Sequence, residues 1–283
     1  MAGDVLVMLT WSIFLLAAVK ATAHLQRHMG ILVASQSSVM SIAALIDITL
    51  LKRGVSGTVS GMAAVSVGLL LGLVHLPILL QTGAGLLFIL TAISQIVLVE
   101  AWLALPAITG GSNGILLSAR PNAATGMVWL LALMAGSGIY IYKNDAKAER
   151  RFDWSCLKSL GLKAEAFGVP SLRLYVIGFA LYGVVLSATG VAATRILGYL
   201  TVTSFGLTWS LAVIMIVLYL PARPLVSALV LSVLYSSIRV LFRQSVYASS
   251  FGSHVFEMLF PLILLLLIQF RPTESKEKPL SSK

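Results

Sequence analysis

Long apolar runs separated by short polar connections are the feature that most constrains the fold of this chain. A helix that crosses a membrane needs about 20 largely apolar residues. Candidate segments of this kind cover residues 5–21, 30–51, 57–75, 86–105, 126–142, 172–193, 205–220, 225–241 and 255–270. Because 58% of the residues are hydrophobic and only 11% are charged, a core of this size could not cover the apolar surface. We therefore predict an all-α polytopic membrane protein with about nine transmembrane helices, buried in a bilayer that is itself apolar.

The basic residues predict how these helices are oriented. The net charge is +10, but Lys and Arg cluster in the short connections, which indicates a topogenic role rather than nucleic-acid binding. If the polar segment 143–170 lies inside and the spans alternate, 14 basic residues lie inside and 6 outside. The N-terminus is then outside and the C-terminus inside. Asp4 rather than a basic residue precedes the first run, so we expect a retained span and no cleaved signal peptide.

The domain organisation expected from this pattern is simple. Residues 1–270 form one transmembrane domain that includes the cytoplasmic segment 143–170. The polar tail 271–283 holds two prolines and no apolar periodicity, so it is expected to be disordered.

Few residues could support catalysis or metal binding. The single cysteine, Cys156, excludes an internal disulfide, and the four histidines are scattered without the spacing of metal ligands. The chain has no G-x-x-x-x-G-K-[ST] phosphate loop. We expect no enzymatic activity and no cofactor. A membrane-embedded enzyme is the alternative, and it would need convergent acids and bases.

Carboxylates inside predicted spans are costly and often functional. Asp47 and Glu100 are of this kind, and both lie toward the outer ends of their spans. A local ion pair of Asp47 with Lys52 or Arg53 is one interpretation, and a functional role is the other. Solvation at the membrane interface is the simpler interpretation of Glu100.

Four consecutive polar residues interrupt the second apolar run. They are Ser35, Gln36, Ser37 and Ser38. Since four residues in a row cannot all face lipid, they either pack against neighbouring helices or line a path for a solute.

A glycine-rich connection follows the fourth predicted span. Its residues are Gly110, Gly111, Ser112, Asn113 and Gly114. Three glycines in five positions favour positive φ angles and close approach of the backbone. The N–H groups of such a turn could bind a carboxylate, although a plain external turn has the same composition.

The cytoplasmic segment has an amphipathic middle. Apolar residues from Trp154 to Phe167 alternate with charged ones, Gly168 allows a sharp exit and Pro170 blocks continuation of a helix. We predict a short helix across the membrane face that presents charges to a cytoplasmic partner. A helix resting in the lipid interface is the alternative.

Two of these segments resemble the permease subunits of branched-chain amino-acid ABC importers. Residues 109–115 are similar to the external T-G-G-x-N/D-G-I segment of that family, and residues 163–169 to its A-x-E-A-x-G-I coupling loop. Tyr199 and Ser204-Phe205 resemble a Y-x-x-P-x-S-F segment, with Val202 in place of proline. The resemblance spans about residues 30–230. In the second span, Ser35 and Ala43 replace glycines of the family.

The resemblance implies a divergent permease subunit in a bacterial inner membrane. It would pair with a second permease subunit, two cytoplasmic ATPase subunits that use ATP, and an extracytoplasmic solute-binding protein. The residues implied for ATPase coupling are Ala164, Glu165, Ala166, Phe167, Gly168 and Val169. The residues implied for the substrate path are Ser35, Gln36, Ser37, Ser38, Gly110, Gly111, Ser112, Asn113 and Gly114. The same architecture importing an amide or urea is an alternative, and an ion-coupled secondary transporter is a further one.

Overall fold

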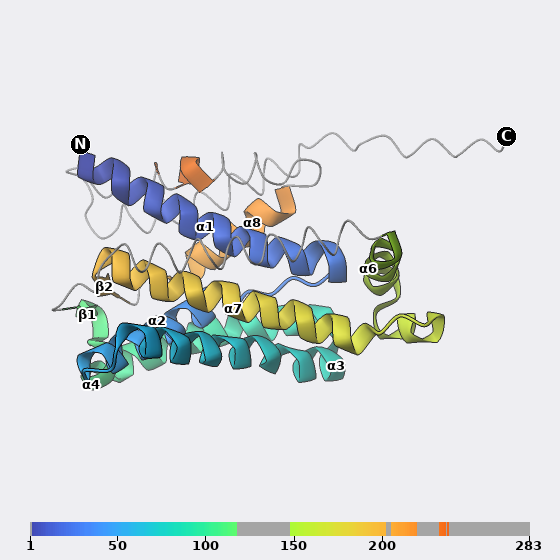
Figure 1. Cartoon of the computed structure of the whole chain (residues 1–283), viewed down its shortest axis with the longest axis horizontal. Coiled ribbons are helices and arrows are strands. Elements are labelled where there is room, and N and C mark those ends of the chain that lie inside the picture. The colour runs from blue at the N-terminus through green and yellow to red at the C-terminus, as the bar shows by residue number, and fades with distance from the viewer. Residues whose placement is uncertain (1, 118–147, 202–204, 220–231, 236, 238–283) are drawn as a thin grey trace.

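The computed structural model describes residues 2–117, 148–201, 205–219, 232–235 and 237, and this part of the chain is mostly helical (Figure 1). The helical class predicted from the sequence is confirmed there, with one two-stranded β-sheet as the exception. Two of the described helices are long and apolar enough to cross a membrane. The predicted spans 126–142 and 255–270, most of 225–241 and the tail 271–283 lie outside the described residues.

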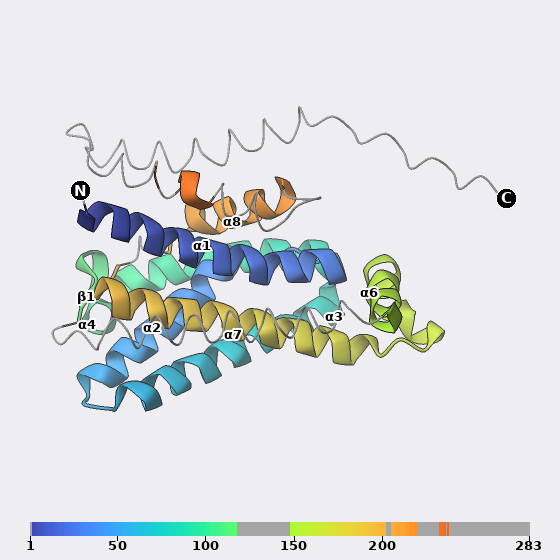
Figure 2. The ribbon, with the colours of Figure 1, turned by 45° about the horizontal axis from the view of Figure 1, so that its top comes forward.

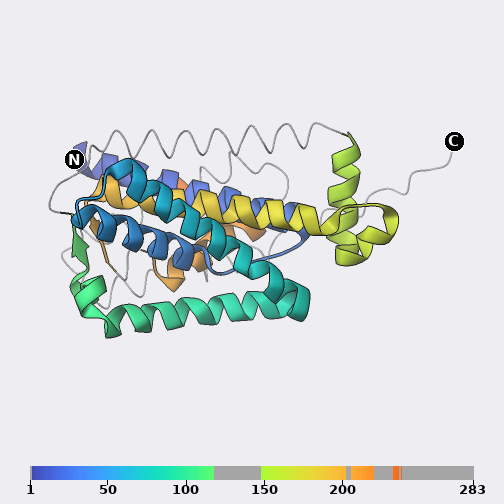
Figure 3. The same ribbon diagram turned by 60° about the horizontal axis from the view of Figure 1, so that its bottom comes forward.

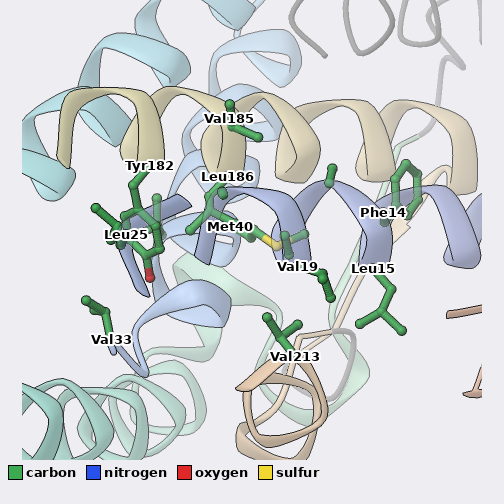
Figure 4. Packing of buried hydrophobic residues seen from close by; sticks show 14 of the residues in the cluster. Phe14, Leu15, Val19, Leu25, Val33, Met40, Tyr182, Val185, Leu186 and Val213 are labelled. Atoms are coloured by element: carbon green, nitrogen blue, oxygen red, sulfur yellow. The ribbon is translucent and has the colours of Figure 1, made fainter. Parts of the chain in front are cut away.

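Helix α7 (Ser171–Leu197) lies in the middle of the helices, between α1 (Ala2–Met29) on one side and α2 (Gln36–Lys52) and α3 (Gly57–Ala104) on the other (Figures 1 and 2). Helix α8 (Leu207–Tyr219) packs against α1. Figure 4 shows apolar side chains of α1, α2, α7 and α8 meeting in one buried cluster, with Met40 among them. The core therefore joins helices that are far apart in the sequence.

The second predicted span begins later than expected. Helix α1 is followed by Gly30, whose φ of 71° needs a glycine, and residues 30–35 are not helical. Helix α2 starts only at Gln36. The predicted helical start at residue 30 is wrong because the glycine ends the first helix and the chain crosses to its neighbour in a non-helical conformation.

The third and fourth predicted spans form two arms of α3. Gly83 has φ 79° and ψ 172°, values that no helix allows, and it divides the element. Figure 3 shows the arms running in opposite directions. We call residues 57–82 the first arm and residues 84–104 the second arm.

Short elements mark the two ends of the molecule. At one end, α4 (Pro106–Thr109) and the 3₁₀ turn η1 (Gly111–Asn113) lead into β1 (Ile115–Leu116), which pairs antiparallel with β2 (Tyr199–Leu200). At the opposite end, α6 (Ala148–Leu160) lies across the bundle and continues into the 3₁₀ turn η2 (Gly161–Phe167) (Figures 1 and 3). We refer to these as the strand end and the α6 end.

Candidate functional site

A groove of about 330 Å³ opens between the first turns of α2 and the two arms of α3. We call it the α3 groove. Most of its lining is apolar side chains, and a smaller set of polar residues joins them: Ser35, Ser38, His75, Thr91 and Ser94. Apolar walls with a few placed polar groups are the usual character of small-molecule sites.

The four consecutive polar residues have different surroundings. Ser35 and Ser38 line the α3 groove. Gln36 instead bonds within the protein, since its amide donates to the Thr22 hydroxyl at 3.2 Å and to the Val33 carbonyl at 2.6 Å. Ser37 bonds the Ser210 hydroxyl of α8. Packing against neighbouring segments is therefore confirmed for Gln36 and Ser37, and a solute path along Ser35 and Ser38 stays a prediction.

A hydrogen-bonded chain of side chains underlies the groove. The Nδ1 atom of His75 lies 3.0 Å from the carbonyl oxygen of Gly72, which can only accept, so Nδ1 carries the proton. Nε2 then accepts from the Ser35 hydroxyl at 2.7 Å. The Tyr182 hydroxyl lies 3.2 Å from Ser35 and donates to it. Hydrogen bonds at Ser35 thus join three elements, namely the first arm of α3, the start of α2 and helix α7.

Two residues of the second arm, Thr91 and Gln95, bond to the segment that contains Ser35. The backbone N–H of Ala34 donates to the Thr91 hydroxyl at 3.0 Å. The Ser38 hydroxyl donates to the side-chain carbonyl of Gln95, whose amide nitrogen donates to the Phe205 carbonyl at 3.3 Å. Sequence reasoning missed His75, Thr91, Gln95 and Tyr182. The signal that could have identified them is that each is a polar residue within or beside an apolar run.

The glycine-rich turn lies at the strand end, and none of its residues lines the α3 groove. The positive φ angles predicted for its glycines are confirmed at Gly110, Gly111 and Gly114. A Cβ at Gly110 would lie 1.9 Å from the Gly114 carbonyl oxygen, and a Cβ at Gly114 would lie 2.3 Å from that of Leu200. The glycines therefore close the turn upon itself and against β2. The side chains of Ser112 and Asn113 are exposed.

A buried ion pair joins three helices toward the strand end. Arg195 donates to Asp47 through Nε at 2.9 Å and through Nη2 at 2.7 Å, and both side chains are nearly inaccessible to solvent. Arg195 also reaches the Gly57 carbonyl and the Ser60 hydroxyl of α3. The local pair of Asp47 with Lys52 or Arg53 is wrong, because the carboxylate turns into the bundle toward α7. Glu100 is exposed.

The segment predicted to bind a cytoplasmic partner forms α6 and η2, as expected for a short amphipathic helix with a sharp exit. Trp154, Leu157 and Ala164 are buried against the bundle. Glu165, Ala166 and Phe167 are exposed, and Phe167 is 64% exposed. Gly168 has φ 78° and its N–H donates to the Glu165 carbonyl, which turns the chain so that Val169 returns to the core. The turn therefore presents an apolar ring and a carboxylate at the α6 end.

Within the described part of the chain, no three His, Cys, Asp or Glu side chains lie together as metal ligands would. Comparison with known proteins finds no matching family model, no matching curated protein and no matching solved structure.

Proposed function

We propose that this chain is the membrane permease subunit of an ATP-driven ABC importer that moves branched-chain or other aliphatic amino acids across a bacterial inner membrane. About nine transmembrane helices would carry the path. A second permease subunit would complete the translocator, two ATPase subunits would supply the energy, and an extracytoplasmic binding protein would deliver the solute. This chain itself would hydrolyse nothing.

The observation that carries the proposal is the exposed turn η2. The sequence there resembles the coupling loop of the permease family, and its Glu165 and Phe167 side chains project from the α6 end rather than packing inward. Such a turn offers an apolar anchor beside a charge, which suits a protein partner. Buried Ala164 and Val169 on either side tie the turn to the bundle, so a force applied to the turn would reach the helices.

The first test is transport. The chain would be reconstituted in proteoliposomes with the ATPase, sister permease and binding-protein subunits encoded beside its gene. We expect ATP-dependent uptake of leucine, isoleucine or valine from a panel that also holds urea and small amides. Uptake of only urea or amides would overturn the cargo, and the absence of any such neighbouring genes would contradict the class.

Coupling is tested by the substitution Glu165→Lys. We expect it to abolish stimulation of the ATPase by the assembled complex while membrane insertion is kept, because the reversed charge lies at the centre of the exposed turn. Ser155→Lys is the matched control, since Ser155 is exposed on the neighbouring α6 and adds positive charge at the same end outside the turn. Equal ATPase stimulation in both variants and the native complex would remove η2 from the mechanism.

An ion-coupled secondary transporter has less support. Such a transporter needs a carboxylate available to bind or release an ion at mid-membrane depth. Asp47 is held by Arg195 in a two-pronged pair, and Glu100 is exposed on the second arm. Neither carboxylate lines the α3 groove.

A further inference from the structure

The α3 groove is long and narrow. Its lining extends over residues 90–101 of the second arm and over residues 71–78 of the first arm. At a rise of about 1.5 Å per residue, the longer of these stretches spans about 16 Å. Dividing the groove volume of about 330 Å³ by this length gives a mean cross-section of about 20 Å². A helix with its side chains is about 10–12 Å wide, so its cross-section is about four times larger or more. The groove is therefore too narrow to hold a helix of another chain.

The polar side chains that line the groove already bond to the protein. The hydroxyl groups of Ser35 and Ser38 donate to side chains of α3. Those of Thr91 and Ser94 donate to backbone carbonyl oxygens of the second arm, and both ring nitrogens of His75 have partners. Among the described residues of the lining, no side-chain donor is left for a polar ligand. A polar head would lose its bonds to water there, whereas a hydrocarbon chain has none to lose.

The mouth of the groove is apolar and open. Val74 of the first arm and Val97 of the second arm belong to the lining, and they are 53% and 60% exposed. Further exposed apolar side chains continue from them along each arm, such as Leu70 and Ile93. Helix α3 is long and apolar enough to cross a membrane, and its arms run in opposite directions beside each other (Figure 3). In a membrane, the groove would therefore open sideways toward the acyl chains of lipids.

The second arm packs on the rest of the molecule along a single stripe. Its buried residues are Leu87, Thr91, Gln95 and Trp102, which follow one another at roughly helical spacing. The groove lies beside this stripe, so an empty groove would leave the facing side chains without contacts on one side. Because the bilayer is as apolar as the groove, a chain that fills the space gains mainly from packing.

We propose that the α3 groove holds one acyl chain of a membrane phospholipid, which fills the space between the two arms and packs the second arm against the bundle. The head group of this lipid stays outside the groove, at the membrane surface. The inference requires a membrane around the chain and goes beyond the proposed function, because no ATPase, binding protein or transported solute takes part in it.

Photolabelling of the purified full-length chain in detergent tests the site. The probe is a phosphatidylethanolamine with a diazirine in the middle of one acyl chain, and adducts are located by mass spectrometry. Val39 lies in the lining and is 2% exposed, so a chain inside the groove reaches it and lipid around the protein does not. We expect adducts on Val39 and on both arms that saturate as the probe is added. Adducts confined to exposed side chains, or adducts that never saturate, would overturn the proposal.

Competitors separate a phospholipid from other occupants of the same groove. Unlabelled phosphatidylethanolamine should suppress the adducts in the groove, and leucine should not. Suppression by leucine would assign the groove to a transported solute and would overturn the proposal. Suppression by oleate at a lower concentration than the phospholipid needs would assign the groove to a free fatty acid, with the same consequence.

Two neighbouring substitutions connect the labelling to the groove. Val97→Trp places an indole ring in the mouth from an exposed position, so the fold should be kept and labelling of Val39 should fall by about tenfold or more. Ile96→Trp is the matched control, because Ile96 is 51% exposed on the same arm and does not line the groove. Equal labelling of the two variants would refute the assignment.

Thermal unfolding gives a readout that does not depend on labelling. A ligand that binds only the folded chain stabilises it, so phosphatidylethanolamine added to the delipidated chain should raise the melting temperature. The rise should be as large in Ile96→Trp as in the native chain. It should be smaller in Val97→Trp, where the indole ring takes the place of the acyl chain. An equal rise in all three proteins, or no rise in the native chain, would contradict a lipid held in the groove.

Discussion

At the scale of single residues, the pair of Asp47 and Arg195 places two charges where solvent hardly reaches them. Removing two charges from water costs several kcal/mol for each ion, and good geometry with further hydrogen bonds must repay it. Here the contact is two-pronged, and the Arg195 guanidinium also reaches Gly57 and Ser60. The pair therefore fixes how α2, α3 and α7 meet.

Removing one member of the pair is expected to destabilise the fold strongly. Asp47→Asn leaves the buried guanidinium without its counter-charge, and we expect a loss of about 3–5 kcal/mol in the free energy of unfolding. Denaturant titration of the purified chain in detergent measures it. Glu100→Gln is the control, since Glu100 is exposed, and it should change little. The double variant Asp47→Leu/Arg195→Met should recover most of the stability, and a native-like Asp47→Asn would show that the pair contributes nothing.

We expect the stability of the folded chain to depend on pH through His24. This residue lies beyond the first predicted span, where α1 contacts α6. Its ring lies 5.7 Å from that of Trp154 and 4.7 Å from that of His28, and neither nitrogen has a hydrogen-bond partner among the described residues. Burial, and then the charge of His28, lowers the pKa of His24 from 6.5 to about 3. Below pH 6.5 the unfolded chain binds a proton that the folded chain excludes.

The stability that depends on His24 is therefore complete above pH 6.5 and falls as the pH drops from 6.5 toward 3. Thermal unfolding of the chain in detergent between pH 5 and pH 8 measures this. His24→Phe keeps an aromatic ring without the titrating group, and it should flatten the pH profile. An unchanged slope in that variant would assign the pH dependence to other groups.

At the scale of elements, small residues let α3 and α7 pack backbone against backbone. Ser60, Ala64, Gly68 and Gly72 recur at every fourth position and are buried. A Cβ at Gly72 would lie 2.3 Å from the Phe179 carbonyl oxygen. Close crossings of this kind are typical of helices packed in membranes. Further along α7, Gly190 lies against the backbone of Met40, so α2 approaches closely although Ser35 and Ala43 replace glycines of the resembled family.

The effect of the close crossing on stability can be measured by comparing Gly72, which lies in the crossing, with Gly85, which lies in the same element but outside it. Gly72→Ala should lower the free energy of unfolding by about 1–3 kcal/mol, because the two backbones must separate. Gly85→Ala should be neutral or should raise it by up to about 1 kcal/mol, since no atom lies within 4 Å of the added Cβ and alanine favours a helix. Denaturant titration measures both. Equal effects would show that the crossing is not tightly packed.

At the scale of the whole molecule, the two ends carry different chemistry. The glycine-rich turn and the strand pair lie at one end with the N-terminus, and α6 with η2 lies at the other (Figure 1). In a membrane, the proposed orientation places the first end outside the cell and the second end inside.

Cysteine labelling in intact cells tests this orientation. Cys156 on α6 should react with a membrane-permeant maleimide and not with an impermeant one, because the proposed orientation places it on the side of the cell interior. In a Cys156→Ser background, Ser112→Cys should react with both, since Ser112 is exposed in the glycine-rich turn. Cys156 is partly buried, so labelling after denaturation gives its full extent. Reaction of native Cys156 with the impermeant reagent would invert the topology and reject η2 as a cytoplasmic docking turn.

Much of the local structure could be predicted, and the site could be predicted only in part. Two residues of the polar run 35–38 line the α3 groove, yet the run indicated neither the break of the helix before Gln36 nor the partners of each residue. His75 and Tyr182 were overlooked because each is a single polar residue within or beside an apolar run. Only their meeting at Ser35 gives them a shared role.

The sequence by itself determined the helical class and the two apolar arms on either side of Gly83, because both follow from the length of the apolar runs. It also determined the positive φ angles of the glycine-rich turn and the sharp exit at Gly168, because both follow from the backbone freedom of glycine. Only the tertiary structure decided that Asp47 pairs with Arg195, and that Ser35 and Ser38 reach a groove while Gln36 and Ser37 do not. Those outcomes depend on which helices become neighbours, and the residues that make the contacts stand as many as 173 positions apart in the chain.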